Sequence, residues 1–125
     1  MDISTLIPNE RVIEIKHPVT DEKVGIRVTL VSLDDEKTKQ TRRRVINKRI
    51  EFEKKGKNFR ADDIEENEMD LIISSMTGWE WYDADFNGEK PVFNEANVKK
   101  VLDNLPWFKR QIAEAISDEK AFFQG

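Results

Sequence analysis

The sequence contains no cysteine, which excludes disulfide bonds, thiolate nucleophiles and zinc sites built on cysteine. Its five glycines are scattered and form no phosphate-binding loop. No apolar run approaches the roughly 20 residues that a membrane-spanning helix needs. The N-terminal segment carries an early acidic residue and no basic region, so we expect no signal peptide. Together these absences favour a protein that is used in a reducing cytoplasm and has no membrane partner.

Histidine is almost absent, since His17 is the single histidine of the chain. It stands beside Pro18 in a segment of turn composition. A serine-hydrolase triad would have only this candidate base and no nucleophile-elbow motif to match it. We interpret His17 as a turn residue and predict that the protein is not an enzyme, with no catalytic residue, no metal ligand and no cofactor.

Charges of both signs are abundant and nearly balanced. The 21 basic and 25 acidic residues leave a net charge of -4, with an isoelectric point of about 5.2. This balance gives no reason to expect nucleic acid or an anionic membrane as a partner. A length of 125 residues suits one modest core, and no break in composition divides the chain. We therefore predict a single domain over residues 1–125.

The clearest secondary-structure signal is a β-strand at residues 23–31. Apolar residues recur there at a period of two, at Val24, Ile26, Val28 and Leu30. Residues 11–17 alternate in the same way, so we predict a β-hairpin over residues 11–31, after a flexible arm over residues 1–10. A lone hairpin is marginally stable. Its apolar strand would be an unprotected edge in a monomer, which favours self-assembly.

The remaining chain, residues 34–123, has helical patterns. The first predicted helix, residues 34–55, carries a thin apolar stripe formed by Val45, Ile46, Ile50 and Phe52. A second helix is predicted over residues 62–76, and residues 77–93 follow as an aromatic loop. Asn94 is placed to cap a third helix, and Pro106 to end it and begin a fourth. The predicted fold class is α+β, mainly α-helical, with an N-terminal β-hairpin followed by about four helices.

One stretch of the aromatic loop begins like the calcium-binding loop of an EF-hand. Asp83, Asp85, Asn87 and Gly88 have the spacing D-x-D-x-N-G. Such a loop needs a bidentate glutamate at its twelfth position, and that position is Asn94 here. Asn-Gly is by itself a strong tight-turn signal. We predict a structural turn and no calcium site.

A basic run over residues 37–49 includes the consecutive Arg42, Arg43 and Arg44. One interpretation is phosphate contact on DNA or RNA, but no aromatic residue interleaves with the run to stack on bases. A second interpretation is a solvated helix face balanced by the acidic helix that follows. A third is an electrostatic patch for another protein, and we keep Arg42, Arg43 and Arg44 as candidate protein-binding residues on that basis.

Aromatic residues gather in the second half of the chain. Trp79 and Trp107 are expected in the core of a small helical protein. The aromatic loop and the C-terminal pair exceed what short helices easily cover, and exposed aromatic residues mark protein-binding surfaces. Trp81, Phe122 and Phe123 are therefore further candidates for protein binding.

The order of these features resembles the small tail assembly chaperones of long-tailed bacteriophages. The likeness covers residues 24–123 and is strongest from Ile72 onward. It lies in a helix that ends at Gly78-Trp79, a turn followed by PVFNE, the segment NVKKVLDNLP and a last helix that ends in AFF. These are apolar and turn positions rather than a catalytic signature.

The resemblance implies a function without catalysis. Such chaperones coat the aggregation-prone tape measure protein, keep it soluble and help to recruit tail tube subunits. It further implies a homo-oligomer in the host bacterial cytoplasm that is absent from the mature virion. Two alternatives remain open: a nucleic-acid-binding regulator that uses the basic helix at residues 37–49, and a structural tail or connector subunit.

Overall fold

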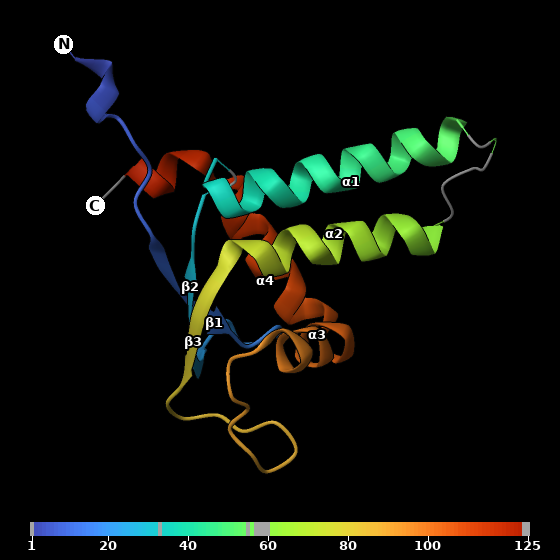
Figure 1. Ribbon diagram of the computed structural model, residues 1–125. Helices are drawn as coiled ribbons and strands as arrows, with labels where there is room; N and C mark the ends of the chain where they lie inside the picture. Colours follow the sequence, from blue (N-terminus) through green and yellow to red (C-terminus); the bar gives the residue numbers. More distant parts are fainter. Residues whose placement is uncertain (1, 33, 55, 57–60, 124–125) are drawn as a thin grey trace.

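The computed structural model describes residues 2–32, 34–54, 56 and 61–123 (Figure 1). A short 3-10 turn, Ile3–Thr5, leads into strands β1, Arg11–Lys16, and β2, Lys23–Leu30. Helices α1, Glu36–Lys54, and α2, Ala61–Ser75, are followed directly by strand β3, Met76–Trp81. Helices α3, Glu95–Asn104, and α4, Pro106–Ser117, and a 3-10 turn, Glu119–Phe123, complete the chain. The predicted α+β class, with a sheet at the N-terminus and four helices, is confirmed.

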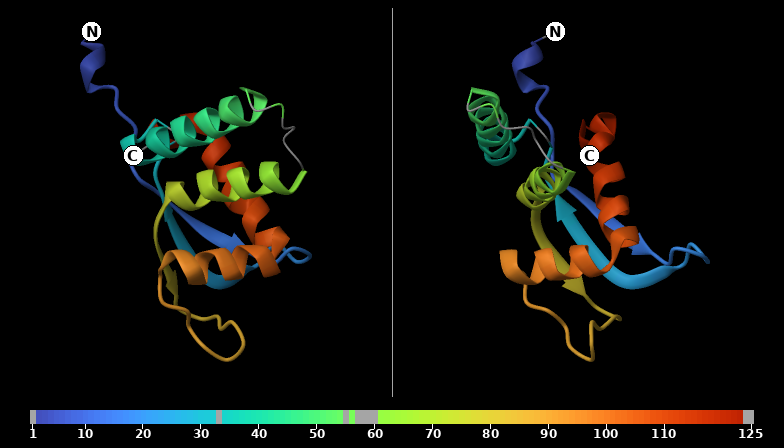
Figure 2. Two further views of the ribbon diagram at one scale, coloured as in Figure 1. Left: turned by 45° about the vertical axis from the view of Figure 1, so that its right-hand side comes forward. Right: turned by 90° about the vertical axis from the view of Figure 1, so that its right-hand side faces the viewer.

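The three strands form one antiparallel sheet in the order β1-β2-β3. The apolar strand β2 is therefore central, and the prediction that it would be an unprotected edge was wrong. The predicted hairpin over residues 11–31 is present, but a third strand completes it. Helices α2, α3 and α4 pack on one face of this sheet, and Figure 2 shows α1 beside α2 on the far side of the molecule from α3.

Strand β3 lies where the sequence predicted an aromatic loop and the last residue of a helix. Its two buried ends, Met76 and Trp81, do not fit a period of two. The register explains this, because Met76 pairs with Leu30 whereas Gly78 pairs with Thr29, so one extra residue is inserted in β3. Such a bulge shifts the alternation by one position. The helix α2 also ends at Ser75 without a loop before the strand.

The core is continuous between the sheet and the helices. Ile15, Val28 and Leu30 from the sheet are fully buried, as are Phe108 and Ile112 from α4. The predicted starts of the last two helices are confirmed. Asn94 caps α3 and accepts a hydrogen bond from the Asn97 amide at 2.8 Å, and Pro106 is the first residue of α4. Apolar burial of this kind is the main favourable term in the stability of a small domain.

Candidate partner-binding surfaces

Two of the three predicted aromatic binding residues are part of the core. Trp81 is 7% exposed and Phe122 is 1% exposed. The prediction that these two side chains form a protein-binding surface was therefore wrong. Phe123, the neighbour of Phe122, is 42% exposed and stays a surface residue.

Trp81 is buried because β3 turns its side chain toward the helices. Its ring lies nearly parallel to that of Phe108, with centroids 6.3 Å apart, and edge-on to Trp79 at 5.4 Å. Trp79 and Trp107 are both half-buried against the core, as expected. The aromatic residues of this region therefore pack β3 against α4. The prediction of an aromatic loop at residues 77–93 did not anticipate this contact.

The arginine triplet does not form one surface. Consecutive residues of an α-helix point about 100° apart, so three in a row cannot share a face. Arg44 lines a cleft of about 250 Å³ together with Asp70 of α2 and Val98 of α3. Arg42 and Arg43 are exposed and form no ion pair with any residue that the structure describes.

Two isoleucines lie exposed on the same helix. Ile46 is 50% exposed and Ile50 is 44% exposed. Being four residues apart, they are neighbours on one face of α1, and Arg42 and Arg43 precede Ile46 by four and three residues. We call the face formed by Arg42, Arg43, Ile46 and Ile50 the α1 outer face.

The sequence pattern treated these isoleucines as part of one stripe with Val45. The structure separates them: Thr38 and Val45, seven residues apart, lie on the side of α1 that is fully or partly covered, whereas Ile46 and Ile50 lie on another side. The side chains of adjacent helical residues such as Val45 and Ile46 point about 100° apart. The sequence could therefore have predicted that Ile46 and Ile50 lie on a different side of the helix from Val45.

Charge is divided between the two helices of the α1–α2 hairpin. Helix α1 contains eight basic and three acidic residues, and α2 contains six acidic residues and no basic one. Figure 1 shows the two helices side by side and antiparallel, so the acidic helix lies against the basic one. The interpretation of a basic helix balanced by its acidic neighbour is consistent with this arrangement, but only for the side of α1 that contacts α2.

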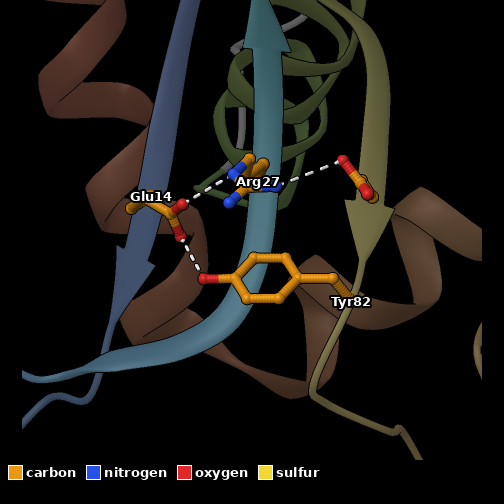
Figure 3. Close-up of polar contacts among 4 residues, drawn as sticks. Glu14, Arg27 and Tyr82 are labelled. Atoms are coloured by element: carbon orange, nitrogen blue, oxygen red, sulfur yellow. Dashed lines mark hydrogen bonds and ion pairs between the residues drawn. The ribbon is translucent and has the colours of Figure 1, made fainter.

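The open face of the sheet carries a closed polar cluster (Figure 3). Glu14 accepts hydrogen bonds from Arg27 Nε and from the Tyr82 hydroxyl, both at 2.8 Å. The Arg27 guanidinium also lies 3.5 Å from a Glu80 carboxylate oxygen and 4.3 Å from the centre of the Tyr82 ring. The cluster holds two carboxylates and one guanidinium, and Arg27 of β2 pairs with Glu14 of β1 and with Glu80 of β3. We therefore interpret the cluster as a link between the three strands.

The cluster also shifts the pKa values of Glu14 and Tyr82. Partial desolvation works to raise the pKa of Glu14, but the hydrogen bonds from Tyr82 and Arg27 outweigh it and hold that pKa below its ordinary value. The same bond to Glu14 raises the pKa of the Tyr82 hydroxyl. Glu14 is therefore maintained as a carboxylate and Tyr82 as a neutral phenol at neutral pH.

A groove of about 490 Å³ runs between β1 and α4. Gln111 of α4 crosses it: its amide oxygen accepts from the Lys16 N–H at 2.9 Å, and its amide nitrogen donates to the Lys16 carbonyl at 2.7 Å. These are the two bonds that a neighbouring strand would offer to an edge residue. Gln111 thus covers part of the free edge of β1, one of the devices by which proteins limit edge pairing.

The two predicted turns are confirmed. Asn87 and Gly88 adopt positive φ values of 53° and 82° in the turn after β3. In the same loop, the ammonium group of Lys90 lies 3.1 Å from the Asp85 carboxylate and forms an ion pair with it. No group of three possible metal ligands occurs among residues 2–32, 34–54, 56 and 61–123. His17 accepts the Val19 amide hydrogen at 3.1 Å within its own turn.

Three kinds of comparison were made with known proteins. Models of protein families, curated proteins and solved structures gave no match to this chain. None of the helices in the described part of the chain is long and apolar enough to cross a membrane. Among the described residues, the α1 outer face combines exposed apolar side chains with arginines that form no ion pair there.

Proposed function

We propose that this protein is a non-enzymatic assembly chaperone of a long-tailed bacteriophage. It binds the tape measure protein, keeps it soluble and helps to recruit tail tube subunits, acts as a homo-oligomer in the host bacterial cytoplasm, and is absent from the finished virion. The resemblance of residues 24–123 to such chaperones supports this proposal.

The observation that carries the proposal is the α1 outer face. Ile46 and Ile50 leave apolar surface in water, and the cations Arg42 and Arg43 beside them are unpaired within the described chain. Exposed apolar side chains ringed by polar groups mark protein interaction sites, and arginine is enriched at the residues that dominate such interfaces. A face of this kind suits a protein that holds another chain in solution.

The test is co-expression with the tape measure protein of the same genome. We expect the client to become soluble and to co-purify with the wild-type protein. A client that stays insoluble, with nothing co-purified, would overturn the proposal. Detection of the protein in purified virions would instead support a structural tail or connector subunit.

The unpaired arginines also favour a second candidate, a nucleic-acid-binding regulator. In that case Arg42 and Arg43 contact phosphates and the affinity for DNA falls steeply as salt is added. The exchange Arg42→Glu with Arg43→Glu would abolish such binding, whereas Ile46→Ser would leave it intact. If the client instead binds at the α1 outer face, both exchanges reduce client recovery.

A further inference from the structure

Helix α1 has two sides of similar chemistry. Its covered side carries Thr38 and the half-buried Val45, and α1 packs beside α2, a helix with six acidic residues. The apolar residues Met69 and Ile72 of α2 belong to the core that α2 shares with the sheet, α3 and α4. Within this molecule, therefore, a basic helix already packs beside an acidic one. This pairing is a precedent for the class of element that could pack on α1.

The α1 outer face repeats that pattern with no element of the described chain over it. Ile46 and Ile50 are one helical turn apart, a separation of about 6 Å along the axis. An approaching helix presents its own i and i+4 side chains at the same separation, so two such pairs can interlock. Arg42 and Arg43 flank the isoleucines and supply the charge.

We infer that the α1 outer face binds an acidic amphipathic helix of the client protein. Apolar side chains of that helix, spaced by four residues, lie over Ile46 and Ile50, and its aspartate or glutamate residues lie beside Arg42 and Arg43. This inference rests on the proposed function and specifies the segment of the client that is recognised.

The apolar centre of the α1 outer face favours a helix over nucleic acid. The centre of the face is apolar, and a phosphate backbone placed across it would contact isoleucine rather than a hydrogen-bond donor. A partner helix can pack on this face at about 8–10 Å between the helix axes. The positive charges of Arg42 and Arg43 then favour an amphipathic helix with acidic residues over one without them.

The first experiment measures binding of a synthetic peptide to the full-length protein. The peptide is a fluorescein-labelled, helix-forming sequence with leucine pairs at i and i+4 and glutamates beside them. Two control peptides are used, one with lysine in place of every glutamate and one with the same composition but leucines two residues apart. We expect the acidic amphipathic peptide to bind at least about tenfold more tightly than either control, and added salt to weaken it.

Protein variants locate the site. Ile46→Ser with Ile50→Ser, and Arg42→Glu with Arg43→Glu, are each expected to reduce affinity by about tenfold or more. The matched controls are Val19→Ser, an apolar residue exposed in the β1–β2 turn, and Lys99→Glu with Lys100→Glu, two exposed cations on α3. They are expected to bind like the wild type. All these positions are exposed, and circular dichroism confirms that each variant is folded.

Several results would overturn the inference. Equal binding of the acidic and lysine peptides would do so, as would unchanged binding by both α1 variants. If Ile46→Ser with Ile50→Ser lowers the molecular mass in light scattering, the occupant is a second copy of this chain and not the client. The co-expression assay separates the two proposals: a client kept soluble by the isoleucine variant contradicts the inference and leaves the chaperone function standing.

Discussion

Tyr82 and Glu14 lie 68 residues apart in the chain, and the phenol of Tyr82 donates a hydrogen bond of 2.8 Å to Oε2 of Glu14. The bond joins β1 to the residue that directly follows β3, across the central strand, on the face that carries none of the helices in the described part of the chain (Figure 3). Arg27 of β2 lies between them and donates to the other oxygen of the same carboxylate. The Glu14 carboxylate thus links β1 to β2 and to the residue that follows β3.

Replacing Tyr82 with phenylalanine is expected to raise the pKa of Glu14, because one of the two hydrogen bonds that favour the carboxylate is lost. A folded-state pKa below the unfolded value stabilises the fold above that value and loses this effect as the pH falls. The stability difference between wild type and Tyr82→Phe should therefore shrink in acid. Carbon-13 NMR titration of the Glu14 carboxyl measures the shift, and an unmoved pKa would contradict the assignment.

Replacing Gly25 with alanine is expected to destabilise the protein by about 1–3 kcal/mol or more. Gly25 has a φ of +99°, and a Cβ there would lie 2.6 Å from the Cβ of Asp83. The matched control is Gly78→Ala, because Gly78 has no positive φ and a Cβ there meets no atom within 4 Å. Urea denaturation compares the two. A Gly25 variant as stable as the Gly78 variant would show that the loop after β3 moves freely.

The two C-terminal phenylalanines are expected to differ sharply in their effect on stability. Phe122→Ala removes a fully buried ring and should cost about 3–5 kcal/mol. Phe123→Ala, at a 42% exposed position, should cost well under half of that. Thermal unfolding of both variants measures this difference. Equal losses would mean that the last turn is packed differently from the arrangement described.

Replacing Gln111 with alanine is expected to release the backbone of Lys16. The Lys16 N–H and carbonyl would both lose their partner, and this part of the β1 edge would become available for pairing. Hydrogen exchange of the Lys16 amide should quicken by about tenfold, the equivalent of a bond worth roughly 1.4 kcal/mol. The Arg11 amide, in the same strand but away from Gln111, serves as the internal reference. Unchanged exchange at Lys16 would show that Gln111 does not protect the edge.

The sequence by itself determined the elements whose signals are local. The alternation at residues 24–30 predicted β2, the asparagine at position 94 predicted the start of α3, and Pro106 predicted the start of α4. These predictions depended on steric preferences and on capping bonds within a few residues. Asn87-Gly88 belongs with them, because positive φ is a property of the residues themselves.

Only the tertiary structure decided which side chains face water. The bulge in β3 interrupts the alternation of buried and exposed residues, so no local pattern marks this segment as a strand. The strand and the burial of Trp81 follow from its pairing with β2. Phe122 became a core residue because the last turn packs back on the sheet and helices, and Asn9 donates a backbone bond of 2.7 Å to its carbonyl. On α1, which packs beside α2, Val45 is half-buried and Ile46 is exposed. Burial depends on contacts between distant parts of the chain, and such contacts set which of several apolar faces is left for a partner.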